Sequence, residues 1–322
     1  MYDKDLFARV AEPYGVEVTP ELTEKLDIYA RLLVEWNEKM NLTAITDPVG
    51  IAVKHFADSL TVAPLLPEGE FSLIDVGTGA GFPGVPLALY RPDCKLTLLD
   101  SLNKRLTFLE TVCREVSLPV TLIHARAEEG GLNPDLREKY DVACARAVAA
   151  LPTLSEYCLP FVKVGGRFLA LKGPDADREL EDARRGVGIL GGKVVGVQAL
   201  TIPAAPIEGM EPMERRLVQI EKIKHTPAQW AFRWLWDQKE VTCVLSGMNS
   251  MEMVLDNINT ASTTNAGDLT DADNDMLKAV ASAINAKMKV GCTACGYCMP
   301  CPAGVDIPGT FAAYNRRYTE SK

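Results

Sequence analysis

The sequence of 322 residues contains no apolar run of the roughly 18–20 residues that a membrane-spanning helix requires. Its first ten residues, MYDKDLFARV, are charged and lack the apolar stretch of a secretory signal. Basic residues are also few, because 34 lysines and arginines stand against 43 acidic residues, for a formal net charge of −9. We therefore expect a cytoplasmic, monomeric protein with no membrane partner. Any contact with nucleic acid must come from a local basic patch.

Cysteine is sparse over most of the chain. Five of the nine cysteines are scattered singly, as small buried residues usually are. The others form a C-x2-C-x2-C-x2-C-P motif of Cys292, Cys295, Cys298 and Cys301. An odd total without a signal peptide indicates a reduced compartment, so these four are expected to be metal ligands rather than disulfides. The compact spacing favours a [4Fe–4S] cluster, with zinc or no ordered metal as alternatives.

The apolar pattern divides the chain into three parts. Residues 1–66 have the spacing of amphipathic helices. Residues 67–224 alternate helical patterns with short β-rich runs: FSLIDV, KLTLLD, PVTLIH, YDVACAR, GRFLALKG, KVVGVQALTI and RRLVQIEKI. This alternation predicts a doubly wound, mostly parallel sheet of seven strands, covered by helices on both faces. Residues 225–322 are expected to form a mainly helical appendage with one strand at residues 241–248.

A glycine-rich segment, DVGTGAGFPG, follows the first predicted strand and precedes a helix. Glycines allow a tight turn and a close approach of the backbone to a ligand. Asp75 ends that strand, and Asp100 ends the next one, where a carboxylate can accept the ribose hydroxyls of a nucleoside. The pattern D-x-G-x-G-x-G is typical of loops that bind S-adenosylmethionine (SAM). The spacing Gly79-x-Gly81-x-x-Gly84 also fits a dinucleotide fingerprint, which leaves an oxidoreductase as the alternative.

Several segments carry a closer resemblance. They are DVGTGAGFPGVPLAL, LLDSLNKRLTFLE, HARAEE and ARAVAALPTLSEYCLPFVKVGGRFLALKG, with WNEKMNLTAITD and KHFADSL upstream. Together they resemble the RsmG (GidB) family, which methylates N7 of a guanosine in bacterial 16S ribosomal RNA. Over residues 1–224 the resemblance implies a Rossmann-like class I methyltransferase fold, SAM as cofactor, and 16S rRNA or the 30S subunit as partner.

The resemblance also implies, position by position, a set of cofactor contacts: Gly77, Gly79, Phe82, Asp100, Ser101, Leu102, Ala127, Glu128 and Arg146. The glycines and Phe82 would lie along the methionine and adenosine portions, and the segment from Asp100 to Leu102 along the ribose. Ala127 and Glu128 would lie on the adenine side. The resemblance would place Arg146, at the end of the fourth predicted strand, beside the methionine group. An arginine at the end of a buried strand also needs an anionic partner.

The expected chemistry requires no general base, because N7 of neutral guanine already carries a lone pair. We therefore assign no catalytic residue. Basic side chains near the expected site are candidates for RNA contact: Lys54, His55, Lys104, Arg105, Arg126 and Lys172. Asn37, Asn41 and Asp58 are candidates for reading the base edge. Most lysines and arginines are simply solvated, which is the leading alternative for each single cation. His55 could equally form a hydrogen-bonded structural pair with Asp58.

The last hundred residues resemble a different family. HTPAQWAFRWLWDQKEVTCVLSGMNSMEMVLDNI and CTACGYCMPCPAGVDIPGTF are similar to the end of aldo/keto reductases that carry an appended iron–sulfur motif. Such a barrel needs about 250 residues, and only about two of its eight units are present, so no reductase activity is expected. The junction at Thr226-Pro227-Ala228 favours a recombined chain. The alternative function is an oxidoreductase or electron carrier that uses the cysteine motif.

Overall fold

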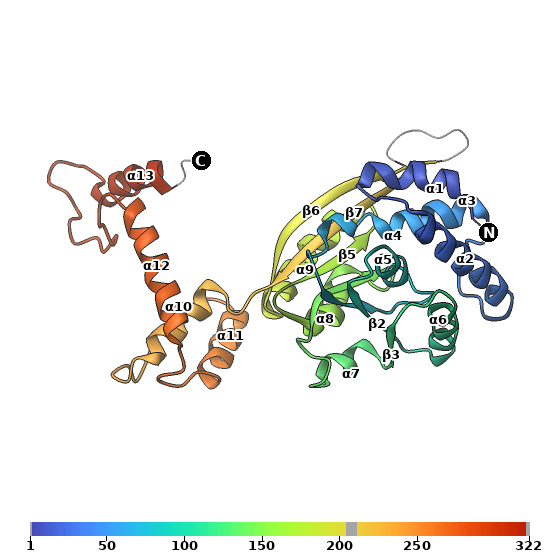
Figure 1. The fold of residues 1–322 in the computed structure, drawn as a ribbon. Helices are drawn as coiled ribbons and strands as arrows, with labels where there is room; N and C mark the ends of the chain where they lie inside the picture. Colours follow the sequence, from blue (N-terminus) through green and yellow to red (C-terminus); the bar gives the residue numbers. More distant parts are fainter. Residues whose placement is uncertain (1, 204–210, 320–322) are drawn as a thin grey trace. The chain divides into compact units, whose positions relative to one another are not determined.

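The computed structural model describes residues 2–203 and 211–319. The chain divides into two compact units, Met1–Thr226 and Pro227–Lys322, hereafter the first and second units. Figure 1 draws the first unit in blue to yellow and the second in orange to red. None of the helices in the described ranges combines the length and the apolar character of a membrane span.

A seven-stranded sheet organises the first unit, in the order β3-β2-β1-β4-β5-β7-β6 (Figure 1). Strands β1 to β5 run parallel, and β7 is antiparallel to both β5 and β6. The strands are β1 (Phe71–Val76), β2 (Cys94–Asp100), β3 (Val120–His124), β4 (Tyr140–Arg146), β5 (Val162–Lys172), β6 (Gly192–Ile202) and β7 (Met213–Lys222). This is the topology of class I methyltransferases, which confirms the predicted fold class and its seven strands.

The strand order identifies the edge of the sheet at which a ligand is expected to bind. Strand β1 pairs with β2 on one side and with β4 on the other, so the chain reverses its direction of winding between β1 and β4. Open α/β sheets bind ligands at such a switch point, outside the carboxyl ends of the strands. The loops after β1 and β4 are therefore the segments in which a site is expected.

Helices cover both faces of this sheet because neighbouring strand residues point to opposite sides. On β1, Leu73 joins a core that contains Phe56 and Phe108, whereas Ile74 joins a core that contains Phe168. The sheet helices are α5 (Gly84–Tyr90), α6 (Asn103–Glu115), α7 (Ala127–Leu132), α8 (Leu151–Cys158), η4 (Leu159–Phe161) and α9 (Ala176–Ile189).

The amino-terminal residues form the helices that the sequence predicts. Thr19 caps α2 by accepting a hydrogen bond from the amide of Leu22 at 3.2 Å, and Pro20 occupies the first helical position. The segment contains α1 (Lys4–Ala11), η1 (Glu12–Tyr14), α2 (Pro20–Met40), α3 (Pro48–Gly50), η2 (Ile51–Ala57), α4 (Asp58–Leu60) and η3 (Ala63–Leu65). Tyr29 of α2 and Phe56 of η2 pack into the core that contains Leu73.

The second unit is helical, with α10 (Pro227–Asp237), α11 (Met251–Ser262), α12 (Asp271–Lys287) and α13 (Ile307–Thr319). The strand predicted at residues 241–248 is wrong, because that segment is irregular and the described part of this unit offers no strand to pair with it. Helix α12 begins at Asp271, since Thr270 and Asp273 form a capping box.

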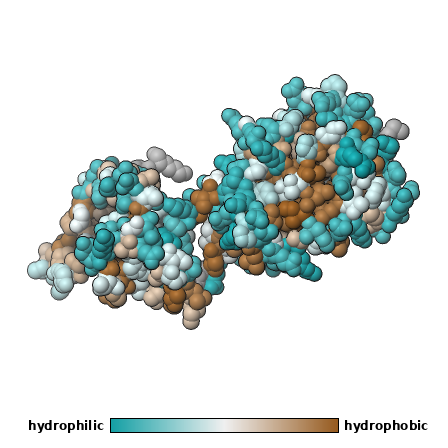
Figure 2. Space-filling view, turned by 60° about the horizontal axis from the view of Figure 1, so that its bottom comes forward, coloured by the Kyte–Doolittle hydropathy of each residue, from teal (hydrophilic) through white to brown (hydrophobic). Residues whose placement is uncertain are grey.

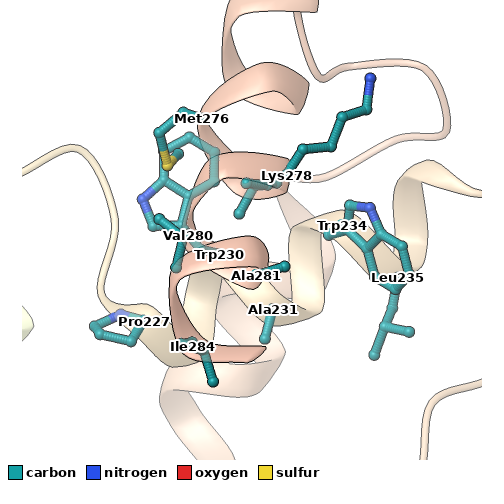
Figure 3. A pocket seen from close by; sticks show the side chains of 11 residues that line it. Pro227, Trp230, Ala231, Trp234, Leu235, Met276, Lys278, Val280, Ala281 and Ile284 are labelled. Carbon is teal, nitrogen blue, oxygen red and sulfur yellow. The ribbon is translucent and has the colours of Figure 1, made fainter. Parts of the chain in front are cut away.

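Apolar side chains of the second unit remain at its surface. Among its described residues only Thr260 is buried, at 2% exposure. In Figure 2, which colours the whole chain by hydropathy, brown apolar residues lie among hydrophilic ones on the surface of both units. Helices α10 and α12 enclose an apolar groove of about 710 Å³. Figure 3 shows Trp230, Trp234, Val280 and Ile284 along this groove.

Candidate active site

The glycine loop between β1 and α5 forms the centre of the site. Gly77 has φ +69°, and a Cβ there would lie 2.9 Å from Cγ2 of Val148, so a side chain would be strained and crowded. The Oδ2 atom of Asp75 accepts hydrogen bonds from the Thr78 hydroxyl at 2.8 Å and from the Gly84 amide at 2.9 Å. Asp75 thus ties both ends of the loop to the end of β1.

Burial governs the chemistry of Asp75. Its side chain is fully buried, and desolvation raises the pKa of the carboxyl to about 6, against the hydrogen bonds that lower it. The Cys144 thiol, also fully buried, interacts with this carboxyl. Asp75 does not line the cavity and is a buried tie between the loop and the sheet.

Asp100 fixes the opposite side of the site. Its carboxylate is 1% exposed, and Oδ2 accepts the amide of Gly79 at 2.9 Å and Nη1 of Arg105 at 3.3 Å. Oδ1 accepts the amide of Leu102 at 2.8 Å. Because each carboxylate oxygen has two lone pairs, Oδ1 can still accept a ribose hydroxyl.

A polar cavity of about 280 Å³ opens at the carboxyl ends of the parallel strands. It is lined by residues from the ends of β1, β2 and β4, the segment after β3, and helices α6, α7 and α8: Val76, Gly77, Leu99, Asp100, Ser101, Arg105, Ala125, Arg126, Ala127, Glu128, Ala147, Val148 and Tyr157. The structure therefore brings together five of the expected cofactor residues: Gly77, Asp100, Ser101, Ala127 and Glu128.

The other expected cofactor residues lie outside this lining. Gly79 and Leu102 contribute amides to Asp100, and the Leu102 side chain is 42% exposed. Phe82 is only 6% exposed and belongs to an aromatic cluster. Its ring stacks on His55 at a centroid distance of 4.4 Å and on Tyr29 at 5.2 Å. Phe82 is thus an anchor between the loop and the amino-terminal helices.

His55 is a buried ring and not an exposed cation. It is 6% exposed, and its Nε2 lies 3.0 Å from Oγ1 of Thr43. Its Nδ1 has no hydrogen-bond partner among the described residues, so Asp58 is a nearby charge and not a hydrogen-bond partner. Burial, and secondly the nearby Arg146, lower the pKa of His55 to about 4, so the imidazole is neutral at pH 7. This corrects both expectations for His55, namely RNA contact and pairing with Asp58.

Arg146 finds its anionic partner within the protein. Asp58 is completely buried, and its Oδ2 accepts Nη1 of Arg146 at 2.7 Å. Arg215 of β7 donates from Nε to Oδ1 at 2.8 Å and from Nη2 to Oδ2 at 3.2 Å. Both oxygens of Asp58 are therefore engaged by arginines, which corrects its expected role in reading the base edge.

Asn37 accepts the amide of Thr43 at 2.8 Å, and Asn41 caps α2, so both have structural positions.

The remaining basic candidates divide into two groups. Lys172 is largely buried, donates to the carbonyl of Ala149 at 2.8 Å and pairs with Glu179 at 2.7 Å, so its expected RNA-facing position is wrong. Arg105 pairs with Asp100 and lines the cavity. Three candidates remain exposed: Lys54, Lys104 and Arg126.

Three features of the site were missed in the sequence. Val148 follows the end of β4, so the rule that placed Arg146 at the ligand edge could also have indicated it. Tyr157 of α8 lines the cavity, and Arg215 of β7 holds Asp58. No local pattern marks these two residues, because their partners come from distant parts of the chain.

The cysteine motif lies in the second unit. Cys292 and Cys301 are half-buried, while Cys295 and Cys298 are exposed. Across the described residues, no group of three or more histidine, cysteine or acidic side chains could hold a metal ion. As placed, the four thiols do not fit a shared metal, and the expected cluster stays a prediction.

Comparisons with known proteins concern the first unit. The family model of "GidB: rRNA small subunit methyltransferase G" matches residues 22–207. The ribosomal RNA small subunit methyltransferase G of Acetivibrio thermocellus is 45% identical over 228 residues, or 70% of this chain and 91% of that protein. Its counterpart from Clostridium beijerinckii is 48% identical over 228 residues, or 69% and 92% of the two chains.

Among solved structures, precorrin-6y C5,15-methyltransferase from Geobacter metallireducens is 18% identical and has a TM-score of 0.42. The similarity covers 55% of this chain and 90% of that one. The family match and the curated relatives both fall on the unit that contains the glycine loop and the Asp100 cavity. The chain belongs to the rRNA small subunit methyltransferase G family.

Proposed function

We propose that the first unit transfers a methyl group from SAM to N7 of a guanosine in 16S rRNA, acting on the small ribosomal subunit as a cytoplasmic monomer. The observation that carries this proposal is the cavity between Gly77, Asp100 and Glu128 at the switch point of a methyltransferase-type sheet. Membership of the rRNA small subunit methyltransferase G family supports the choice of substrate.

The residues of the cavity fit the nucleoside part of SAM. Gly77 leaves space for the backbone to approach the ligand, since a Cβ there would already meet Val148. Asp100 is held in place by two backbone amides and retains acceptor capacity for the ribose. Ala127 and Glu128 would lie along the adenine, with Tyr157 as a further wall of the cavity. When bound, SAM supplies a methyl group activated by a sulfonium.

The reaction suits a site without a free base. Guanine N7 attacks the methyl carbon with its lone pair while the carbon–sulfur bond breaks, so S-adenosylhomocysteine leaves and the positive charge passes to the guanine. No proton moves. Asp58 is locked between two arginines. His55 is buried with its Nε2 against Thr43, and its pKa is lowered to about 4, so it is a weak base. The protein would act by alignment and exclusion of water, which can lower a barrier by roughly 7–11 kcal/mol.

The RNA would meet a small basic surface on an acidic protein. Lys54 lies beside Arg146, Lys104 lies in the first turn of α6, and Arg126 lines the cavity. Each is exposed and can contact a phosphate. Loss of one phosphate contact lowers the salt slope of binding to single-stranded nucleic acid by about 0.7. Binding carried by these residues would therefore be weak at high salt.

For the second unit, we infer from the cysteine spacing a [4Fe–4S] site that takes no part in methyl transfer. The resemblance of residues 225–322 to aldo/keto reductases supports a remnant of such a chain as its carrier. The placement of the thiols does not support this inference. Anaerobic purification of the full chain, followed by iron and sulfide determination, tests it. About four irons per chain would support the cluster, while zinc or no metal would contradict it.

The methyltransferase function is tested with 30S subunits that lack the modification. We expect the purified chain to transfer labelled methyl from SAM to 16S rRNA, and chemical cleavage specific for N7-methylguanosine to map it to one nucleotide. The Asp100→Ala variant should lose activity, whereas Asp135→Ala, an exposed acidic position away from the cavity, should retain it. Absence of incorporation, or methylation at another atom, contradicts the proposal.

A further inference from the structure

The Asp58 carboxylate connects three segments that are far apart in sequence. It begins α4, and it binds Arg146, 88 residues away at the end of β4, and Arg215, 157 residues away on β7. All three side chains are largely withdrawn from solvent, with exposures of 0% for Asp58, 12% for Arg146 and 22% for Arg215. This cluster adjoins the switch point, but the cavity lining does not include it.

Arg215 holds the carboxylate in a way that a simple charge could not. Its Nε donates to one oxygen and its Nη2 to the other, so the guanidinium contacts the carboxylate as a two-pronged fork. Bidentate pairing fixes the plane of a carboxylate as well as its position. With the plane fixed, Oδ2 of Asp58 points at Nη1 of Arg146 from 2.7 Å.

Arg146 is consequently held on several sides. Besides Asp58, its Nη1 donates to the carbonyl of Lys54 at 3.0 Å. Its guanidinium carbon lies 5.0 Å from the centre of the Phe82 ring, which belongs to the glycine loop. Two arginines share one carboxylate, so the cluster keeps a surplus positive charge. Arg146 carries that charge at the carboxyl end of β4, the edge at which this fold binds its ligands.

We propose that Arg215 is a positioning residue for methyl transfer: by locking the Asp58 carboxylate, it fixes Arg146 at the edge where the guanine meets the methyl donor. This inference rests on the proposed function. Arg215 acts through Arg146 and does not itself touch a substrate. A purely structural ion pair would stabilise the fold equally well but would leave the turnover of the folded enzyme unchanged.

The test compares full-length variants in the 30S methylation assay, with SAM affinity measured by calorimetry and the melting temperature measured for each. For Arg215→Met we expect kcat to fall about a hundredfold, as a displacement of about 1 Å near the reacting atoms can cause. The affinity for SAM should change by less than about threefold, since Asp100 and Gly77 are untouched. Arg215→Lys keeps the charge but not the fork, and should recover part of kcat.

A double-mutant cycle distinguishes positioning from support of the fold. If Arg215 acts through Arg146, then Arg215→Met should cause no further loss of kcat in an Arg146→Met background. Independent losses that multiply would overturn the proposal. Arg216→Met is the matched control, because Arg216 follows on the same strand and pairs with Asp177 and Glu214 instead. It should leave kcat unchanged.

Two further results overturn the inference. One is an Arg215→Met variant with wild-type kcat, and the other is an Arg215→Lys variant that is folded but no more active than Arg215→Met. If Arg215→Met does not fold, Arg215→Lys must show a reduced kcat at an unchanged melting temperature, and wild-type kcat there overturns the inference. An inactive wild-type chain contradicts the proposed function as well, whereas an active wild type with unaffected variants contradicts the positioning role alone.

Discussion

The two units of this chain use apolar residues in different ways. In the first unit, the strands present side chains to both faces of the sheet, and helices cover each face, so Phe168 is completely buried. In the second unit, Phe311 is 36% exposed and Leu245 is 95% exposed. The comparison shows that an apolar residue stabilises a fold through the surface that covers it. A sheet with two covered faces supplies such a surface, and four helices with open faces do not.

The largest expected effect is a loss of unfolding free energy, compared for one phenylalanine in each unit. Phe168→Ala should lower the free energy of unfolding of the first unit by about 3–5 kcal/mol, because it opens a cavity in a closed core. Phe311→Ala should lower that of the second unit by about half as much, because a third of the Phe311 surface is already exposed at 36%. Chemical denaturation monitored by circular dichroism measures both. Equal losses would mean that the second unit has a core of its own.

A second expectation concerns two buried titratable groups of the first unit, His55 and Asp75. Below neutral pH they change the stability of the fold in opposite directions. The pKa of His55 is lowered to about 4 in the folded state, so its contribution to stability is complete above about pH 6.5 and is lost as pH falls toward 4. The pKa of Asp75 is raised to about 6, so its contribution is complete below about pH 4 and is lost as pH rises through 6. Each change is worth about 2–3 kcal/mol.

Variants separate the two contributions. Relative to the wild type, Asp75→Asn should gain stability as pH rises from 4 to 6, and His55→Phe should gain stability as pH falls from 6.5 to 4. Urea denaturation of the three proteins at pH 4, 5, 6 and 7 measures the differences. If both variants run parallel to the wild type across this range, then neither group is buried as the structure shows.

A smaller effect is expected when the second unit is removed. A chain that ends at Thr226 keeps both cores, the glycine loop and the Asp100 cavity. Its kcat on 30S subunits should stay within about twofold of the full chain, as expected when no interaction at the transition state is lost. A tenfold loss would show that the second unit contributes to methylation. Circular dichroism of the shortened chain provides the folding control.

The smallest effect is expected at the cysteine motif. Replacing Cys292 and Cys295 with serine should leave methylation unchanged, because the thiols lie outside the unit that contains the glycine loop. The same 30S assay, run under air and under reducing conditions, checks this. The motif would regulate methylation if the activity of the wild type changed between the two conditions and that of the variant did not.

Local patterns predicted most of the fold and about half of the site. The seven strands and the glycine loop are visible because alternation, glycine spacing and terminal acids are properties of adjacent residues. The sequence also indicated that Arg146 needs an anion. It could not show that the anion is Asp58, since that pairing spans 88 residues.

The errors have the same origin. Lys172 has the sequence context of a solvated lysine, but the fold brings Glu179 of α9 to within 2.7 Å of its ammonium. His55 has the sequence context of a polar surface residue, yet Phe82 and Tyr29 form a stack that buries it. The run at residues 241–248 has β-rich composition, but a strand requires a neighbour, and none is present in the described part of the second unit.

The pocket formed by the Gly77 loop and Asp100 should bind SAM. Isothermal titration of the full chain with SAM, and separately with NADH, measures this binding. We expect saturable binding of one SAM per chain, weakened at least about tenfold by Asp100→Ala, and no binding of NADH. Tight binding of NADH together with no heat from SAM would contradict this expectation.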